Sequence, residues 1–273
     1  MTTDPAEAPI GQVSRFRFLI TPKWIAFHLL VAVVVVAMIN LALWQMRRLD
    51  ERRQFNSQVR ANANQPITSL DEVGISTGQP STTEWRRVRV TGTYVAGHQF
   101  QVVNRSQNGE TGRNVVDALQ LGDGSLLLVN RGFVPAADDV PPVPQVSVEV
   151  VGRLRATERR STGQEEDVGN LLTEIRRIDI FVLAAQFDGK LLPMYIEQLK
   201  STPPDAASLQ PIVAPTLDEG PHLSYTIQWF IFSICVIAGW VLAVRRSLAI
   251  RSDKVVKKRR SAYIPIAGEE SKR

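Results

Sequence analysis

Two long apolar runs near opposite ends of the chain constrain its fold more than any other feature. They are Trp24–Trp44 and Tyr225–Val244, 21 and 20 residues long, and neither contains Asp, Glu, Lys or Arg. At a rise of about 1.5 Å per residue, each run spans about 30 Å as a helix, which is the thickness of the hydrocarbon core of a bilayer. The alternative is a buried core helix, but such helices are rarely so long and so free of charge. The sequence therefore predicts two transmembrane α-helices.

The basic residues predict how these helices are oriented. Residues 245–273 carry ten basic and three acidic side chains, whereas the opposite flank of the second run carries Asp218 and Glu219. Because basic residues accumulate on the cytoplasmic side, we expect residues 245–273 to be cytoplasmic, and two spans then place residues 1–23 there as well. The 180 residues between the spans, 45–224, would form an extracytoplasmic domain.

One basic cluster argues for the opposite orientation. Arg47, Arg48, Arg52 and Arg53 follow the first run, but the asymmetry across the second run is larger.

The domain between the spans holds 19 basic and 22 acidic residues, a net charge of −3, so the +5 of the whole chain comes from its tail. We therefore interpret Lys257–Arg260 as a topology signal that contacts anionic lipid, and we predict no nucleic-acid partner.

The first run is predicted to remain as an anchor. It is too long for the apolar region of a signal peptide, and Leu43–Arg47 contains no small-x-small cleavage site. The opening residues contain Asp4 and Glu7 and no arginine-rich amphipathic stretch, which disfavours a mitochondrial transit peptide. We predict a multi-pass protein of the bacterial plasma membrane.

The middle domain is predicted to be α+β, mainly an antiparallel β-barrel or sandwich with one or two helices. Val88, Val90 and Tyr94 alternate with polar residues, as in a half-buried strand. Gly122-Asp123-Gly124 predicts a hairpin, and the apolar run Leu126–Val129 predicts a strand buried on both faces. The expected strands are Arg86–Tyr94, Gln99–Val103, Asn114–Leu121, Ser125–Val134, Val146–Arg155 and Met194–Leu199.

One helix and three loops complete this prediction. Apolar residues recur at three- and four-residue intervals between an Asn170 cap and Gly189, which is typical of an amphipathic helix. These residues are Leu171, Ile175, Ile178, Val182 and Ala185. The expected loops are Ser76–Thr83, Ser161–Gly169 and the proline-rich Ser201–Pro221, which should be extended.

The domain is poor in catalytic and metal-binding side chains. The single cysteine, Cys235, lies in the second apolar run, so neither a disulfide nor CxxC chemistry is available to the chain alone. No nucleophile-elbow, zincin, Walker or dinucleotide motif occurs. The acidic run Glu165–Asp167 is explained by solvation in a polar loop. We predict no catalytic residues and no metal site, and a membrane-anchored hydrolase is the least favoured alternative.

Four segments in order resemble the surfeit-locus protein 1 family of cytochrome oxidase assembly factors. The resemblance covers the chain from about Leu41 to Trp240, and includes the layout of two spans around one domain. One departure is an alanine, Ala42, where the family commonly has glycine. The segments are LALWQMRR at 41–48, VRVTGTY at 88–94, LVNRGFVP at 128–135 and PHLSYTIQWF at 221–230.

The resemblance implies a non-enzymatic assembly factor for a haem–copper cytochrome c oxidase, which helps to deliver or insert haem a into the catalytic subunit. The implied partners are that subunit, haem a synthase and the lipid bilayer, and the implied cofactor is transiently bound haem a. His222 is then the candidate axial ligand, with Tyr225 and Trp229 flanking the macrocycle. The alternative for His222 is an interfacial histidine that caps the helix or contacts lipid headgroups.

Two further residues bear on the same function. Arg131 could pair with a haem propionate through its guanidinium fork, but a strand-end residue that packs or caps is the simpler interpretation. His28 should lie about 25 Å from His222 along the membrane normal, so the two could not ligate one haem within a monomer.

A rival function from a different class is a membrane-tethered scaffold that stabilises a respiratory or envelope complex without touching haem. Haem binding distinguishes the two.

Overall fold

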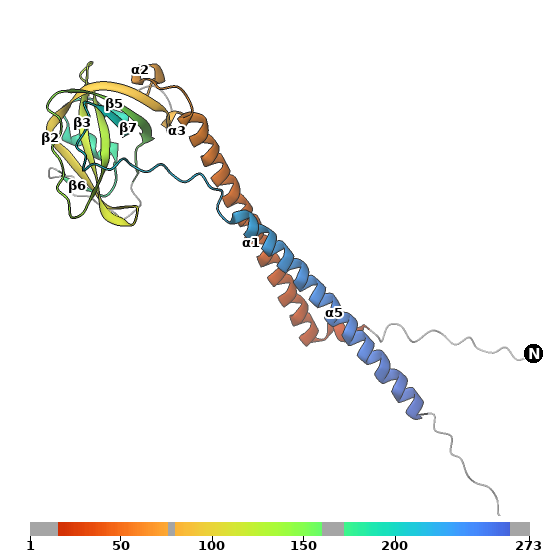
Figure 1. Cartoon of the computed structure of the whole chain (residues 1–273). Coiled ribbons are helices and arrows are strands. Elements are labelled where there is room, and N and C mark those ends of the chain that lie inside the picture. The colour runs from red at the N-terminus through yellow and green to blue at the C-terminus, as the bar shows by residue number, and fades with distance from the viewer. Residues whose placement is uncertain (1–15, 76–79, 160–171, 263–273) are drawn as a thin grey trace, which may run out of the picture. The chain divides into compact units, whose positions relative to one another are not determined.

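The structure is a computed structural model that describes residues 16–75, 80–159 and 172–262 of the 273. The chain divides into two compact units, which we treat separately (Figure 1). The helical unit combines Met1–Arg53 with Glu219–Arg273, and the sheet unit comprises Gln54–Asp218.

Both predicted spans lie within longer helices. Helix α1 covers Pro22–Ala63 and α5 covers His222–Ala262, and a single 3-10 turn, η2 (Arg17–Ile20), precedes α1. By length and composition both helices could cross a membrane, and few residues of their apolar windows are buried. Leu29 is 61% exposed and Ile234 is 66% exposed. A core helix would hide such side chains, so these helices fit membrane anchoring better than a soluble core.

The two helices of this unit run antiparallel and meet through small and polar residues. Ala42 of α1 and Thr226 and Ser233 of α5 are buried. Two side-chain hydrogen bonds join the helices, between Gln45 and His222 and between His28 and Trp240. Helices in lipid gain little from burying apolar surface against each other, so close packing of small residues and polar bonds holds such pairs together.

The sheet unit is built on one mixed sheet. Its long strands are β2 (Arg87–Gln107), β3 (Glu110–Leu121), β4 (Leu126–Pro135), β5 (Ser147–Ala156) and β7 (Leu191–Thr202). The strand order is β1-β2-β3-β4-β7-β5, and β5 also pairs with β2, so the pairings of the five long strands form a closed circuit. The two-residue strands β1 (Thr68–Ser69) and β6 (Glu174–Ile175) both pair with β2.

The prediction of an antiparallel sheet is wrong in part, because β4 and β7 pair in parallel. The other four pairs of the circuit are antiparallel. Directions can alternate all the way around a closed circuit only if the number of strands is even. With five strands, at least one pair must be parallel.

Most expected strands are present. The predicted strands at 86–94 and 99–103 form one strand, β2, whose pairing with β3 shifts register between Tyr94 and Gln99. The hairpin at Gly122–Gly124 joins antiparallel β3 and β4, as predicted. Strand β4 is buried on both faces: Leu127 and Val129 belong to one core cluster and Leu128 to the other.

The predicted helix over 171–185 is wrong. Ile175 forms strand β6 against Val102, and only a four-residue helix, α4 (Ile180–Leu183), and a 3-10 turn, η3 (Ala184–Gln186), follow. Of the predicted periodic residues, Ile175 and Ile178 are buried in one core cluster, Val182 is half-buried and Ala185 is exposed. The periodicity thus found two buried side chains but not their backbone. β-branched isoleucines favour extended backbone, which agrees with this outcome. Asn170 and Leu171 lie outside the described residues.

The loop predictions have mixed outcomes. The segment expected as a loop at 76–83 ends in a one-turn helix, α3 (Pro80–Thr83), and a second short helix, α2 (Leu70–Val73), precedes it. Residues 76–79 and 161–169 lie outside the described ranges. Ser201 and Thr202 of the expected loop 201–221 belong to strand β7, so the prediction is wrong for these two residues. Residues 203–221 contain no helix or strand, as expected, and Gln210 forms an isolated bridge with Phe133 of β4.

Candidate functional site

The residues proposed from the sequence fall into two groups. His222, Tyr225 and Trp229 lie in the first two turns of α5 in the helical unit, and Arg131 lies on β4 in the sheet unit. Positions 222, 225 and 229 share one side of α5, because residues three and seven apart in a helix fall on the same face.

The imidazole of His222 is oriented by α1. Its Nδ1 lies 2.8 Å from Oε1 of Gln45, a residue 177 positions away in the chain. An amide oxygen only accepts hydrogen bonds, so with the amide in this orientation Nδ1 carries the proton. In the neutral ring Nε2 then keeps its lone pair, which is the state that a metal ligand needs. A hydrogen bond from the other ring nitrogen is the usual support of a ligating histidine.

Tyr225 and Trp229 add aromatic surface beside this imidazole. Tyr225 is 45% exposed, and Trp229 is half-buried, with its ring edge-to-face with Phe232 at 6.0 Å. Among the described residues no group of three or more His, Cys, Asp or Glu side chains is arranged to hold a metal ion. A single oriented imidazole can supply one ligand to a metal that holds other ligands of its own.

His28 does not share this site. Its Nδ1 accepts a 2.8 Å hydrogen bond from Nε1 of Trp240. Trp240 lies 18 residues from His222 on the same helix, which corresponds to about 27 Å of helix rise. His28 and His222 thus stand at opposite ends of the helix pair.

Arg131 is the most completely buried charged side chain of the described sheet unit. Its side chain has no exposed surface, and it forms ion pairs with Asp117 at 3.0 Å and Asp205 at 2.6 Å. Asp205 is held by two parallel bonds from Nε and Nη2. The carbonyl oxygens of Pro141 and Pro142 accept the remaining two donors, at 3.3 and 3.0 Å. All five guanidinium donors are thus paired within the protein, which favours the packing role that the sequence left open over a propionate contact.

The pKa values around Arg131 reflect burial and this pairing. Burial alone would lower the pKa of Arg131, but the two carboxylates outweigh it and raise the pKa. Burial raises the pKa of Asp117 above its ordinary value, against the pull of Arg131. Burial would also raise the pKa of Asp205, but the hydrogen bonds and charge of Arg131, with hydrogen bonds from Ala206 and Gln198, together outweigh burial and lower the pKa. Pairing within the cluster therefore offsets part of the cost of burying its charges.

The backbone next to Arg131 explains the Asn-Arg-Gly sequence. Strand β4 shifts register against β3 between the pairs Val116–Asn130 and Val115–Gly132, so Arg131 is the extra residue of a bulge. A Cβ atom on Gly132 would lie 2.7 Å from the carbonyl oxygen of Gln210. Only glycine allows the segment around Gln210 to cross this closely.

A second buried charged cluster escaped the sequence analysis. Glu197 of β7 pairs with both Arg153 and Arg155 of β5, at 2.8 and 2.7 Å. Arg155 also pairs with Glu84 and stacks over the ring of Trp85 at 3.9 Å. The alternation Arg153-Leu154-Arg155 would have indicated two arginines on one face, but their partner lies 42 residues away from Arg155.

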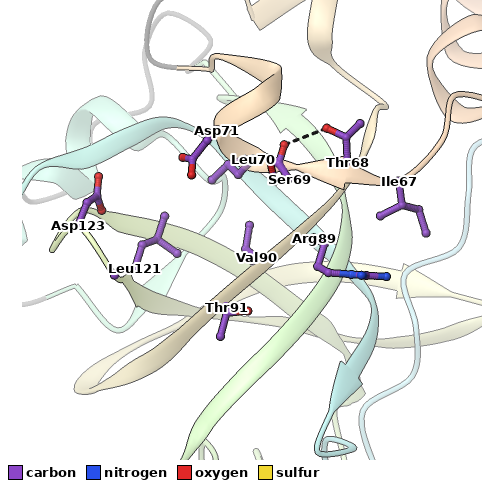
Figure 2. A pocket seen from close by; sticks show the side chains of 11 residues that line it. Ile67, Thr68, Ser69, Leu70, Asp71, Arg89, Val90, Thr91, Leu121 and Asp123 are labelled. Carbon is purple, nitrogen blue, oxygen red and sulfur yellow. Dashed lines mark hydrogen bonds between the residues drawn. The ribbon is translucent and has the colours of Figure 1, made fainter.

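A cavity of about 590 Å³ lies where β1 and α2 approach β2 and the β3–β4 turn (Figure 2). Figure 2 shows Leu70, Val90 and Leu121 among its lining side chains. Two of its three charged side chains are already engaged: Asp123 accepts two hydrogen bonds from Ser125 within the turn, and Arg89 lies 3.6 Å from Glu149. None of the residues predicted as a site lines this cavity.

Comparison with known proteins identifies the family. A family model described as the SURF1 family matches residues 32–234, which is most of the chain. An uncharacterised SURF1-like protein of Mycobacterium tuberculosis is 29% identical over 232 residues, covering 82% of this chain and 84% of its own length. SURF1-like proteins of Monosiga brevicollis and Rickettsia felis are 28% and 22% identical, covering 78% and 82% of this chain and 85% and 99% of their own. This chain belongs to the SURF1 family.

Proposed function

We propose that this protein is a non-enzymatic assembly factor for a haem–copper cytochrome c oxidase, and that it hands haem a to the catalytic subunit. Membership of the SURF1 family supports the general role. The observation that supports haem handling is the hydrogen bond between Gln45 and His222, which leaves Nε2 free to bind iron. Haem a is cargo in this proposal and not a resident cofactor. Besides the catalytic subunit, the proposed protein partner is haem a synthase.

The proposed site needs to supply only one ligand to the haem iron. Haem iron carries four porphyrin nitrogens, so one protein imidazole is enough to hold it as an axial ligand. Gln45 fixes the ring orientation, and the exposed Tyr225 and half-buried Trp229 provide apolar surface for the macrocycle edge. A carrier must also release its cargo, and a site with a single ligand on an open surface suits transfer better than an enclosed pocket.

The basic residues at 245–273 support a membrane orientation. We propose a multi-pass protein of the bacterial plasma membrane with both termini cytoplasmic. Gln45 and His222 are close in sequence to the residues of the sheet unit, which supports a site at the membrane face on the side of that domain. The proposed haem site would then lie at the extracytoplasmic interface.

The test is an optical spectrum of the detergent-purified protein after co-expression with the haem a synthesis enzymes. The wild type should show a Soret band near 400 nm, and His222→Ala should lose it. A matched control is His98→Ala, because His98 contacts Gln186 and Phe187 in the sheet unit, far along the chain from His222. A band that survives His222→Ala would discard the site, and no band in any variant would favour the haem-free scaffold.

A deletion strain tests the role itself. Loss of the protein should lower spectrally detectable haem a while the oxidase polypeptides are still made. Normal haem a content in that strain would refute the assembly role, whatever the purified protein binds.

A further inference from the structure

The two sides of α1 differ within its apolar run. Toward α5, the half-buried or buried positions include Val35, Met38, Ala42 and Gln45, which recur every three or four residues. The opposite side is exposed. It carries Leu29 at 61%, Val33 at 65%, Val36 at 58%, Leu43 at 42% and the exposed Asn40.

These exposed residues follow a heptad pattern. Leu29, Val36 and Leu43 are separated by seven residues each, and Val33 and Asn40 alternate with them at spacings of four and three. In coiled-coil notation the first set occupies d positions and the second a positions. Valine at a and leucine at two of the three d positions favour two-stranded parallel pairing, and a single asparagine at a fixes the register. The seam is about 21 Å long, so it fits within the hydrocarbon core.

The carboxamide of Asn40 would find no hydrogen-bond partner in the hydrocarbon core of a bilayer. Its Nδ2 donates to the carbonyl oxygen of Val36, 2.8 Å away on the same helix. Within the described residues no hydrogen bond joins Asn40 to α5, so one amide N–H and the amide oxygen face outward. His28, the other strongly polar residue of the run, is bonded to Trp240. A polar group that faces hydrocarbon without a partner is costly, and an interhelical hydrogen bond removes that cost.

We propose that this seam of α1 joins two copies of the chain into a parallel homodimer, with the two Asn40 side chains hydrogen-bonded to each other. The proposal rests on α1 spanning the membrane and is independent of haem binding. Copies inserted with the same orientation can be related only by a two-fold axis along the membrane normal, so each residue meets its own counterpart at the same depth. A carboxamide is both donor and acceptor, so Asn40 is complementary to itself. A helix of another protein would need a polar group at that depth, which a second copy has by symmetry.

Disulfide cross-linking of the full-length protein in native membranes tests the seam. In a Cys235→Ala background, Val36→Cys and Leu43→Cys should oxidise to a dimer with copper phenanthroline. Leu41→Cys is the matched control, because Leu41 is 39% exposed but lies off the seam, and it should stay monomeric. Absence of dimer, equal cross-linking at all three positions, or cross-linking to a protein of different mass would overturn the proposal.

The role of Asn40 is tested by energy transfer between labelled copies diluted in liposomes. Asn40→Val should weaken dimerisation by about 3- to 30-fold, the range expected for one hydrogen bond between membrane helices. Gln228→Leu removes an exposed polar side chain from α5 and should leave dimerisation unchanged. An Asn40→Val protein that dimerises like the wild type would refute the proposal. The Soret band of the same samples separates this outcome from failure of the proposed haem site.

Discussion

The two units of this protein treat their polar groups in opposite ways. The sheet unit encloses Arg131 completely and pairs all five of its donors with its own acceptors. The helical unit exposes large apolar side chains and joins its helices through two side-chain hydrogen bonds. The sheet unit therefore resembles a domain folded in water, which buries its apolar surface and pairs its buried charges. The helices suit a solvent that tolerates apolar surface and penalises lone polar groups.

The difference predicts where substitutions do most damage. In the sheet unit, removal of one partner leaves a buried charge that water cannot reach. In the helical unit, loss of a polar contact removes a single bond between helices whose apolar side chains suit a membrane. Four predictions test this contrast, in order of decreasing effect.

The largest effect is expected from Arg131→Met. It leaves the carboxylate of Asp117, whose side chain is 1% exposed, without its counter-ion, and breaking a buried ion pair on one side costs about 3–5 kcal/mol. Pulse proteolysis in urea, with the full-length protein in mild detergent, would measure the free energy of unfolding of the sheet unit. The control is Arg89→Met, because the exposed contact of Arg89 with Glu149 should contribute less than about 1 kcal/mol. Equal losses for the two variants would contradict the contrast.

A smaller effect is expected from Asp205→Asn, and it should depend on pH. The lowered pKa of Asp205 means that its ionised form adds stability above its unfolded pKa of about 3.9, which is lost as pH falls through the folded pKa. The pKa of Asp117 is raised, so its effect has the opposite sign: its ionisation lowers the stability of the folded state as pH rises. At pH 7 the variant should lose about 1.5–3 kcal/mol, and the gap to wild type should narrow below pH 4. A gap that is constant from pH 7 to pH 3 would argue against this assignment.

Gln45→Leu probes the helical unit at its proposed functional end. It removes the acceptor that orients His222, and loss of such a supporting contact typically weakens binding at a metal site by about 10- to 100-fold. Titration of the purified protein with haem, followed at the Soret band, gives the affinity. Gln45→Glu keeps an oxygen acceptor and should bind nearly as well as the wild type. Unchanged affinity in Gln45→Leu would mean that His222 needs no orienting partner.

The smallest effect is expected from Trp240→Phe. It removes the hydrogen bond to His28 but keeps an aromatic ring, and such bonds between membrane helices contribute about 0.6 kcal/mol on average. Steric trapping of the helix pair in bicelles would measure the change. Trp229→Phe is the control, since the described ring contact of Trp229 is with Phe232 on its own helix. A loss of helix-pair stability above about 2 kcal/mol would contradict the contrast, because this hydrogen bond would then contribute as much as a buried polar contact of the sheet unit.

Local features of the sequence predicted local structure well. The uncharged runs gave both long helices, because length and lack of charge depend only on neighbouring residues. The Gly122–Gly124 hairpin and strand β4 followed from turn residues and continuous apolar character. In contrast, the parallel β4–β7 pair arises from closure of a five-strand circuit, which no local pattern encodes.

The site was predicted only as far as its individual residues. His222 was selected by its resemblance to a family, but Gln45, its partner, lies 177 residues away. Arg131 was selected with two roles in view, and the choice between them depends on Asp205, 74 residues away. Periodicity over 171–185 identified buried isoleucines but could not decide between helix and strand, since pairing of Ile175 with Val102 is also a long-range contact.

The crossing of Gln210 over Gly132 has a consequence for the order in which the domain assembles. Gln210 and Phe133 exchange backbone hydrogen bonds of 2.8 and 2.9 Å, so strand β4 must exist before residues 203–221 can settle against it. Joining Arg131 to Asp205 also closes a loop of 74 residues, whose entropic cost is repaid only after the intervening strands have paired. We therefore expect the proline-rich segment to join the sheet unit after strand β4 has paired. Until it does, Arg131 lacks one of its two carboxylates, Asp205.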